Sequence, residues 1–189
     1  KLIKREIKHA QEGKEAFIKA KMNSLCDRDI IAALYEASKA GVKIDLVVRG
    51  ICCLKTGIAG VSENITVCSI VGNFLEHSRI FWFHNDGQEE IYMGSADWMP
   101  RNLDRRVEIM FPVEDEVLMD QVRHVMETQL ADNTKANILQ PGGRYEKIDK
   151  RGKRLVNSQE QFCEEAKAAV PKKANVYQER VFIPAEPVN

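Results

Sequence analysis

Two hydrophobic periods alternate along the first fifty residues. Charged and apolar residues recur at helical spacing over residues 1–13, whereas every second residue is apolar within 15–22 (EAFIKAKM), which is typical of a strand. A second helical pattern follows Asp27, whose carboxylate is suited to an N-cap. The run 43–48 (KIDLVV) predicts another strand. Strand, helix and strand in this order predict a parallel pair joined by a right-handed crossover.

The remaining pattern predicts a sheet extended by further strands. Four more runs have strand composition, at 64–71, 78–84, 90–93 and 106–111. The segments 115–129 and 158–169 repeat apolar residues at helical spacing. An Asp-Gly pair at 86–87 favours a hairpin turn between two of the strands. A polar, basic stretch at 145–154 predicts a surface hairpin.

This order of elements predicts one α/β domain over residues 1–170, with a mixed β-sheet and helices on both faces. A chain of 189 residues is long enough for one domain with its own core. Residues 171–189 contain three prolines and little periodicity, so we expect a tail there. No apolar run approaches the ~20 residues that span a bilayer, and the charged start does not resemble a signal peptide.

Composition narrows the classes of partner. Hydrophobic residues make up 44% of the chain, and 28 basic residues balance 28 acidic ones. A neutral chain argues against a polybasic nucleic-acid binder, so no nucleic acid is expected as a partner. Five cysteines occur without any Cys-x-x-Cys pair, which indicates reduced, buried thiols in a cytoplasmic protein and no metal site.

The segment 74–79 (FLEHSR) is the strongest candidate for chemistry. His77 and Arg79 are two residues apart at the start of a predicted strand, so they share one face. Arg79 is suited to holding phosphate oxygens while His77 attacks or donates a proton. The plainer interpretation is a solvated strand end.

A second candidate is the segment 94–106 (GSADWMPRNLDRR). The Ser95 hydroxyl and the N–H groups that follow it are suited to binding an anion, and three arginines, Arg106 among them, add positive charge. Asp97 could orient His77 by accepting a ring N–H. The alternative is a turn with an exposed basic cluster.

A third candidate lies at the ends of two predicted strands. Arg49 directly follows the apolar run 43–48, and Asn23 ends the strand before it. Ligands of open α/β sheets bind at the carboxyl ends of strands, although a surface arginine that ends a strand is the plainer interpretation. The chain contains no Walker loop, which excludes a P-loop kinase.

At these residues the chain resembles the long bacterial polyphosphate kinases. Four strings carry the resemblance: KMNSL (21–25), LYEASKAGVKIDLVVRGICCL (34–54), FLEHSRIFWF (74–83) and GSADWMPRNLDRRVE (94–108). Their order and spacing match as well, from about residue 1 to about residue 165. The matching region is the last domain of that enzyme, so the resemblance implies a phospholipase D-like fold.

The resemblance implies a kinase that reversibly transfers the terminal phosphoryl group of ATP to polyphosphate, with ADP as the other nucleotide. In that family the group passes through a phosphohistidine of the preceding domain, which is absent here, and His77 matches a second catalytic histidine. Arg49 matches an arginine that contacts ATP phosphates, and Arg79 and Arg106 match other basic positions. Mg²⁺ is expected with the nucleotide, with ligands mostly outside this chain.

The resemblance also implies partners and a location. The rest of the same enzyme chain is the expected partner, with a homo-oligomer at full length, and the isolated fragment is expected to be inactive. A cytoplasmic location is expected, with peripheral membrane association left open. Asn73 departs from the family pattern, because a basic residue is expected at its position.

Two other functions remain open at this stage. One is a phospholipase D-like phosphodiesterase or nuclease that pairs two copies of His77 across a dimer. The general phospholipase D pattern has a lysine where Arg79 stands and an asparagine where Asp97 stands, which counts against it. The other is a non-catalytic module that binds polyphosphate or a nucleotide.

Overall fold

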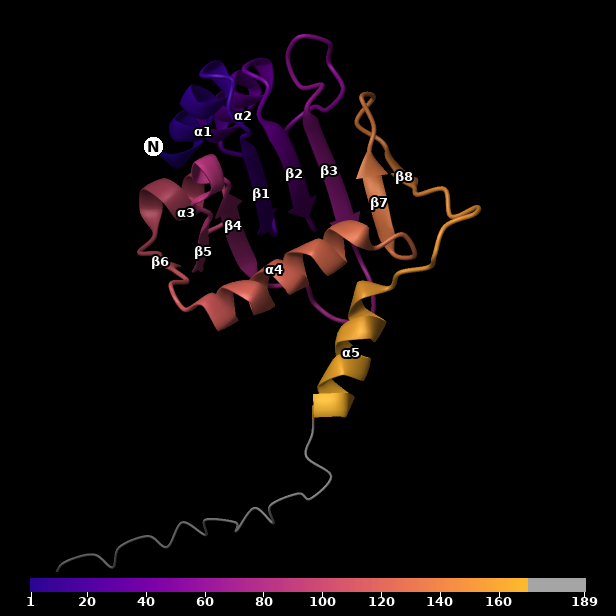
Figure 1. Cartoon of the computed structure of the whole chain (residues 1–189). Helices are drawn as coiled ribbons and strands as arrows, with labels where there is room; N and C mark the ends of the chain where they lie inside the picture. The colour runs from indigo at the N-terminus through magenta and orange to yellow at the C-terminus, as the bar shows by residue number, and fades with distance from the viewer. Residues whose placement is uncertain (170–189) are drawn as a thin grey trace, which may run out of the picture.

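A mixed sheet of eight strands forms the centre of the computed structural model, which describes residues 1–169 (Figure 1). The strands lie in the order β6-β5-β4-β1-β2-β3-β7-β8. Their bounds are β1 Phe17–Met22, β2 Lys43–Val48, β3 Ile65–Ile70, β4 Arg79–Phe83, β5 Glu90–Gly94, β6 Met110–Pro112, β7 Ala136–Leu139 and β8 Tyr145–Lys147. The helices are α1 Leu2–Gln11, α2 Arg28–Lys39, α3 Pro100–Arg105, α4 Glu116–Ala131 and α5 Ser158–Ala169, and a 3₁₀ turn spans Asn85–Gly87.

Strand directions decide which loops meet. The three central strands β1, β2 and β3 run parallel, as the strand–helix–strand pattern predicts. β4 and β7 pair antiparallel with β1 and β3, and β5 and β8 then return in the direction of the central strands. The carboxyl ends of β1, β2, β3, β5 and β8 therefore lie at the same edge of the sheet as the beginnings of β4 and β7. We call this side the carboxyl edge.

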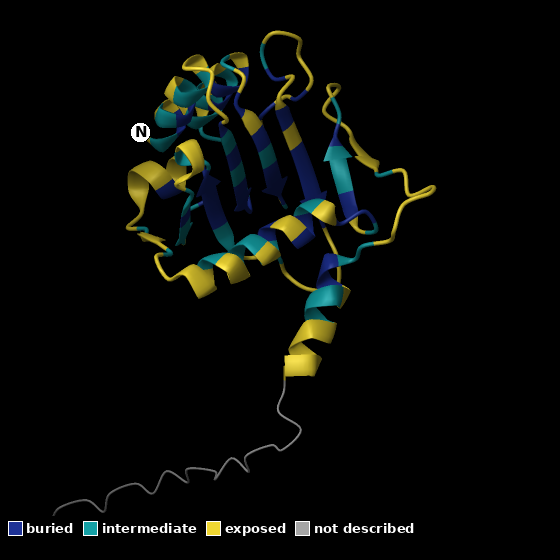
Figure 2. Cartoon of the chain, viewed as in Figure 1, coloured by how far each residue is buried: buried dark blue, intermediate teal, exposed yellow. Residues whose placement is uncertain are grey.

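Helices cover both faces of the sheet, as predicted from the sequence. On one face α1 and α2 pack on a cluster that includes Ile18, Leu46 and Phe81. On the other face α4 crosses the strands and packs on Ile80, Trp82 and neighbouring residues through Met126. The strands β1 to β4 are mostly buried between these layers (Figure 2), whereas β6 and β8 at the two edges of the sheet are exposed. The two-sided burial explains why β2 and β3 carry apolar residues on both of their faces.

Several local predictions are confirmed. The Asp27 carboxylate caps α2 by accepting a hydrogen bond of 2.9 Å from the Ile30 N–H. The bounds of β2 and α5 agree with the prediction. β4 and β5 form the expected hairpin, in which Asn85, Asp86 and Gly87 all adopt positive φ. These elements depend on short-range patterning, which a sequence displays directly.

Other local predictions are wrong. The predicted strand 106–111 survives only as β6, because residues 106–109 form a connection in which Val107 is 99% exposed. The helix α3 was not predicted, and Pro100 occupies its first turn, where a missing N–H does no harm. The strand β7 was not predicted, and the basic stretch 145–154 contributes the short strand β8 before a turn at Lys150–Lys153.

The expected boundary at residue 170 and the tail 171–189 lie outside the described residues. Among residues 1–169, no helix is long and apolar enough to cross a bilayer. All five cysteines are free thiols. The prediction that they are buried is wrong for Cys53, which is exposed, and holds fully for Cys68 alone.

Candidate active site

The candidate residues from four separate segments meet at the carboxyl edge. Asn23 follows β1, Arg49 follows β2, Arg79 begins β4 and Asp97 lies three residues beyond β5. The register brings them together, because Lys21 pairs with Ile80 and Arg79 pairs with Gly94. Sequence reasoning placed Asn23 and Arg49 at the same edge, and the structure agrees.

Asp97 is the centre of the hydrogen-bonded cluster. Its carboxylate accepts bonds from the Asn23 N–H at 2.8 Å and from the Asn23 side-chain amide at 3.3 Å. It also accepts from Arg79, at 3.1 Å from Nε and 3.4 Å from Nη2. The expectation that Asp97 orients the His77 ring is therefore wrong. Arg79 carries a permanent charge and presents a fork of donors, so it is the stronger partner for the carboxylate.

Arg49 is held by a neutral partner. Its Nε and Nη2 donate to the Asn23 Oδ1 at 3.1 and 2.7 Å. The Asn23 amide thus connects Asp97 to Arg49, with the nitrogen facing the carboxylate and the oxygen facing the guanidinium. Arg49 makes no ion pair with a carboxylate of residues 1–169, so its charge is oriented without being neutralised.

His77 lies on the exposed loop that leads into β4. Arg79 fixes its backbone, because Nη1 donates to the His77 carbonyl at 2.7 Å. The same guanidinium therefore bonds to Asp97 and to the loop. No contact within the described residues assigns a partner to the imidazole ring, so its chemical role remains a prediction.

Ser95 and Arg106 converge on a residue that the sequence argument missed. The Ser95 hydroxyl and the Asn102 amide both donate to the Glu108 carboxylate, and the Ile109 N–H donates to Ser95 Oγ at 3.1 Å. Arg106 Nε lies 3.3 Å from Glu108. The hydrogen bonds from Ser95 and Asn102 lower the pKa of Glu108. Part of the positive charge predicted for Arg106 is thus balanced within the chain.

Gly94 is required where this loop leaves β5. A Cβ at Gly94 would lie 2.5 Å from the Ile109 carbonyl oxygen, which is backbone and cannot turn aside. The close approach brings the two segments together so that Ser95 N–H donates to the same carbonyl at 3.0 Å.

A buried polar network beneath the His77 loop was also missed. Glu76 accepts hydrogen bonds from Gln129 of α4 and from Gln159 of α5, the latter at 2.8 Å. Lys21 of β1 lies 3.5 Å from the same carboxylate and donates to Ser78. The signal available in the sequence was Lys21, a lysine within a strand that is buried on both faces.

Lys21 is only 1% exposed, and burial lowers its pKa although Glu76 opposes this shift. A charge at this depth is tolerated because the carboxylate, the hydroxyl and a carbonyl surround it. The network joins β1, α4 and α5 to the residue directly before His77. It therefore limits how far the loop can move.

Gln159 also forms two hydrogen bonds with the backbone of the loop. Its Oε1 accepts from the Phe74 N–H at 3.1 Å, and its Nε2 donates to the Phe74 carbonyl at 2.8 Å. Gly72 makes room for this contact, because a Cβ there would lie 2.3 Å from Oε1. Beside the loop is a hollow of about 440 Å³, lined by Arg49, Ile70, Val71, Gly72, Asn73, Phe74 and Leu75.

Comparison with known proteins gives a consistent picture. Residues 1–159 match the family model described as polyphosphate kinase C-terminal domain 2. A polyphosphate kinase of Lactiplantibacillus plantarum is 53% identical over 165 residues, which is 87% of this chain and 23% of that relative. The crystal structure of a polyphosphate kinase from Porphyromonas gingivalis matches with a TM-score of 0.85 and 42% identity, over 88% of this chain and 26% of that one.

A more distant likeness concerns the fold alone. Nuc of Salmonella typhimurium, a phospholipase D family member, matches with a TM-score of 0.51 at 15% identity, over 71% of this chain and 88% of that one. The chain itself spans only 20 to 24% of the length of curated relatives that it matches.

Proposed function

The chain belongs to the polyphosphate kinase family, and we propose on this premise that it supplies one half of a site for phosphoryl transfer. The reaction is the reversible transfer of the terminal phosphoryl group of ATP to polyphosphate. The other half, with the histidine that becomes phosphorylated, belongs to a preceding domain outside this chain. The observation that carries the proposal is the meeting of Arg49, Arg79 and His77 at one edge of the sheet.

The arrangement suits a phosphate ligand for a physical reason. Catalysis of phosphoryl transfer is mostly positioning and electrostatic stabilisation, so fixed cations matter more than covalent chemistry. Arg49 is oriented by the neutral Asn23 and keeps its full charge for phosphate oxygens. Arg79 shares its charge with Asp97, so in this proposal it serves chiefly to hold the His77 loop, with the phosphate as a further partner.

His77 is assigned the role of proton donor or electrostatic partner of the reacting phosphate. Charge builds on the leaving oxygen during transfer, and a positioned acid contributes about 10²–10⁴-fold to the rate. The loop of His77 is held by Arg79 and, through Glu76, by three other elements. A held backbone limits the orientations that the exposed imidazole samples.

We propose that Mg²⁺ arrives with the nucleotide and that its ligands lie mostly outside this chain. Among residues 1–169, no three His, Cys, Asp or Glu side chains lie together as metal ligands. The carboxylate at the centre of the cluster, that of Asp97, already accepts hydrogen bonds from Arg79 and Asn23. Mg²⁺ bound to the nucleotide would neutralise phosphate charge, and none of the roles proposed here depends on it.

The test uses the longer protein that carries this domain. His77→Gln keeps a hydrogen-bonding group but cannot carry a proton, so turnover in both directions should fall at least 10²-fold. The matched control is His124→Gln, because His124 lies on α4 and pairs with Glu165 of α5. Thermal stability is measured on the same samples. Turnover above about half of the wild-type value in His77→Gln would remove general-acid work by His77 from the proposal.

The same assay separates the rival functions. The isolated 189-residue chain should make no polyphosphate from ATP, because in this proposal it holds one of the two catalytic histidines and the other lies in the preceding domain. Sustained synthesis by this chain would contradict the two-domain proposal. Hydrolysis of a phosphodiester by the isolated chain would favour the phosphodiesterase, for which the likeness to Nuc supports the fold only. Binding of polyphosphate without turnover in the longer protein would favour a binding module.

Partners and location follow from the same premise. We propose that the domain acts together with the rest of a longer enzyme chain, and that this enzyme forms a homo-oligomer in the cytoplasm or at a membrane surface. Size measurement of the longer protein, with and without polyphosphate, tests the oligomer. Fractionation of cells tests the location.

A further inference from the structure

We propose that a linear chain of phosphates lies in a groove along the carboxyl edge of the sheet, from Arg49 to Lys150 and Arg154. We call it the edge groove, and it is lined by residues of 70–75, 134–135, 150–167 and Arg49. The proposal rests on the proposed function, which makes polyphosphate the ligand at Arg49. It adds a binding path for the rest of that ligand, well beyond the reacting end.

Three adjoining hollows make up the edge groove. The hollow of about 440 Å³ beside Arg49 shares Asn73 and Phe74 with a second of about 300 Å³. The second shares four residues with a third of about 710 Å³, namely Lys135, Asn157, Glu160 and Glu164. Because each hollow shares walls with the next, an extended ligand can pass along all three.

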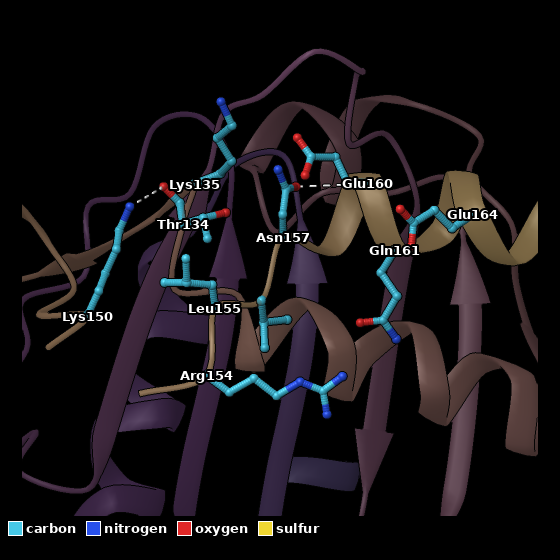
Figure 3. A pocket seen from close by; sticks show the side chains of 10 residues that line it. Thr134, Lys135, Lys150, Arg154, Leu155, Asn157, Glu160, Gln161 and Glu164 are labelled. Atoms are coloured by element: carbon cyan, nitrogen blue, oxygen red, sulfur yellow. Dashed lines mark hydrogen bonds between the residues drawn. The ribbon is translucent and has the colours of Figure 1, made fainter. Parts of the chain in front are cut away.

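The topology of the sheet explains why the hollows line up. β7 runs antiparallel to β3, so Lys135, which directly precedes β7, lies beside the carboxyl end of β3. β8 returns toward the same edge, and Lys150 follows it three residues later. Lys150 Nζ then reaches the Thr134 carbonyl at 3.4 Å, and both residues line the third hollow (Figure 3).

A buried carboxylate makes the walls of the third hollow rigid. Asp132 accepts hydrogen bonds from the N–H groups of Thr134 and Lys135 at 2.9 and 2.8 Å. It also accepts from the N–H and the hydroxyl of Ser158, each at 2.8 Å. The loop that carries Lys135 and the start of α5 are thereby tied to one side chain. A preformed groove loses less entropy when a ligand binds.

Positive charge prevails along the edge groove. Five basic side chains line it, in order Arg49, Lys135, Lys167, Lys150 and Arg154, against two carboxylates, Glu160 and Glu164. Within residues 1–169 none of the five forms an ion pair with a carboxylate, whereas Arg151 of the same turn pairs with Asp149. Figure 3 shows Lys135, Lys150 and Arg154 around one hollow, with Glu160 and Glu164 on the helix beside it.

The lining favours an inorganic phosphate chain over a nucleic acid. Sites for single-stranded nucleic acids combine cations with aromatic platforms on which bases stack. Phe74 is the one aromatic residue among those that line the three hollows. Polyphosphate has charge at every unit and no base to stack, so spaced cations without aromatic platforms are suited to it.

The test compares short and long phosphate ligands on the 189-residue chain. Tripolyphosphate should bind at the Arg49 end of the groove, whereas long polyphosphate should also contact the far end. The double variant Lys150→Gln/Arg154→Gln should lower the affinity for long polyphosphate about tenfold at low salt, because two exposed ion pairs with the ligand are lost. The same variant should lower the affinity for tripolyphosphate by less than about twofold. The matched control Arg151→Gln/Lys153→Gln removes the same charge outside the groove and should weaken neither ligand by more than about twofold.

Acidic residues of the groove give a test of opposite sign. Glu160→Gln/Glu164→Gln should tighten binding of long polyphosphate, because two repulsive charges disappear from the wall. Unchanged affinity in both groove variants, or equal weakening in the groove and control variants, overturns the proposal. Single-stranded DNA that binds more tightly than polyphosphate, and that loses affinity in Lys150→Gln/Arg154→Gln, also overturns it.

The two proposals fail in distinguishable ways. If wild-type chain does not bind tripolyphosphate, or if Arg49→Ala binds it normally, the phosphate site of the proposed function is wrong. If tripolyphosphate depends on Arg49 but long polyphosphate ignores Lys150 and Arg154, only the edge groove is wrong. If the affinity for long polyphosphate depends on both ends, both proposals gain support.

Discussion

Replacing Asp97 by asparagine removes the negative charge and one of the two acceptor oxygens that Arg79 and Asn23 share. In the wild-type chain four hydrogen bonds end on this carboxylate, two from Asn23 and two from Arg79. An asparagine at this position offers one acceptor oxygen and presents an amide nitrogen to the other donors. The positive charge of the nearly buried Arg79 guanidinium then no longer faces a carboxylate.

The magnitude follows from burial. The Arg79 and Asp97 side chains are 11% and 9% exposed, so solvent screens their interaction only weakly. Removing one partner of a buried ion pair typically costs about 3–5 kcal/mol of unfolding free energy. Asparagine retains one hydrogen bond of about 1 kcal/mol, so we expect Asp97→Asn to cost about 2–4 kcal/mol. Asp97→Ala should cost more, because it retains none.

Urea unfolding of the 189-residue chain measures this loss as a change in midpoint at constant slope. The control is Asp149→Asn, because the Asp149–Arg151 pair is exposed and its loss should leave the midpoint nearly unchanged. Tripolyphosphate affinity is measured on the same variants, and it should fall in Asp97→Asn because Asn23 no longer holds Arg49 in place. Stability within about 0.5 kcal/mol of wild type would refute Asp97 as the centre of the cluster.

Two further predictions concern the loops of the site. Gly72→Ala should lower the free energy of unfolding by about 1–3 kcal/mol, since the new Cβ would lie 2.3 Å from Gln159 Oε1 and displace it from Phe74. In a Gln159→Ala background, which makes room for the Cβ, most of that loss should disappear. Additive losses in this double-mutant cycle would contradict the steric argument. The folded-state pKa of Glu108 is lowered by Ser95 and Asn102, so its stabilisation is fully present above the unfolded-state pKa of about 4.3 and is lost as pH falls through the lower folded value. Thermal unfolding of wild type and Glu108→Gln should therefore converge on acidification, and a stability difference that is constant with pH would contradict this assignment.

Most of the fold follows from patterns within short segments. The alternation at 15–22, the helix after Asp27 and the run 43–48 predict β1, α2 and β2, and their order predicts the parallel pairing. The elements missed were α3 and β7, and β6 was predicted with the wrong bounds; all three are short. In such segments few apolar residues are buried, so the hydrophobic period that reports secondary structure is weak.

For the candidate site, residue types could be predicted and partners could not. Arg49, His77 and Asn23 were identified from their places at strand ends, because the position of a strand end is a local property. The pairing of Asp97 with Arg79 in place of His77 depends on the register of β4 against β5, which no short segment contains. Glu76, Gln129 and Gln159 were missed for the same reason, since they meet from three distant segments.

The sequence by itself therefore determined the class of fold, the edge of the sheet at which strands end, and the three arginines Arg49, Arg79 and Arg106. Only the tertiary structure decided which cations are neutralised and which keep their charge. Arg79 and Arg106 have carboxylate partners, whereas Arg49 has the amide of Asn23. The physical reason is that secondary structure depends on periods of a few residues, whereas an ion pair depends on packing between segments far apart in the chain.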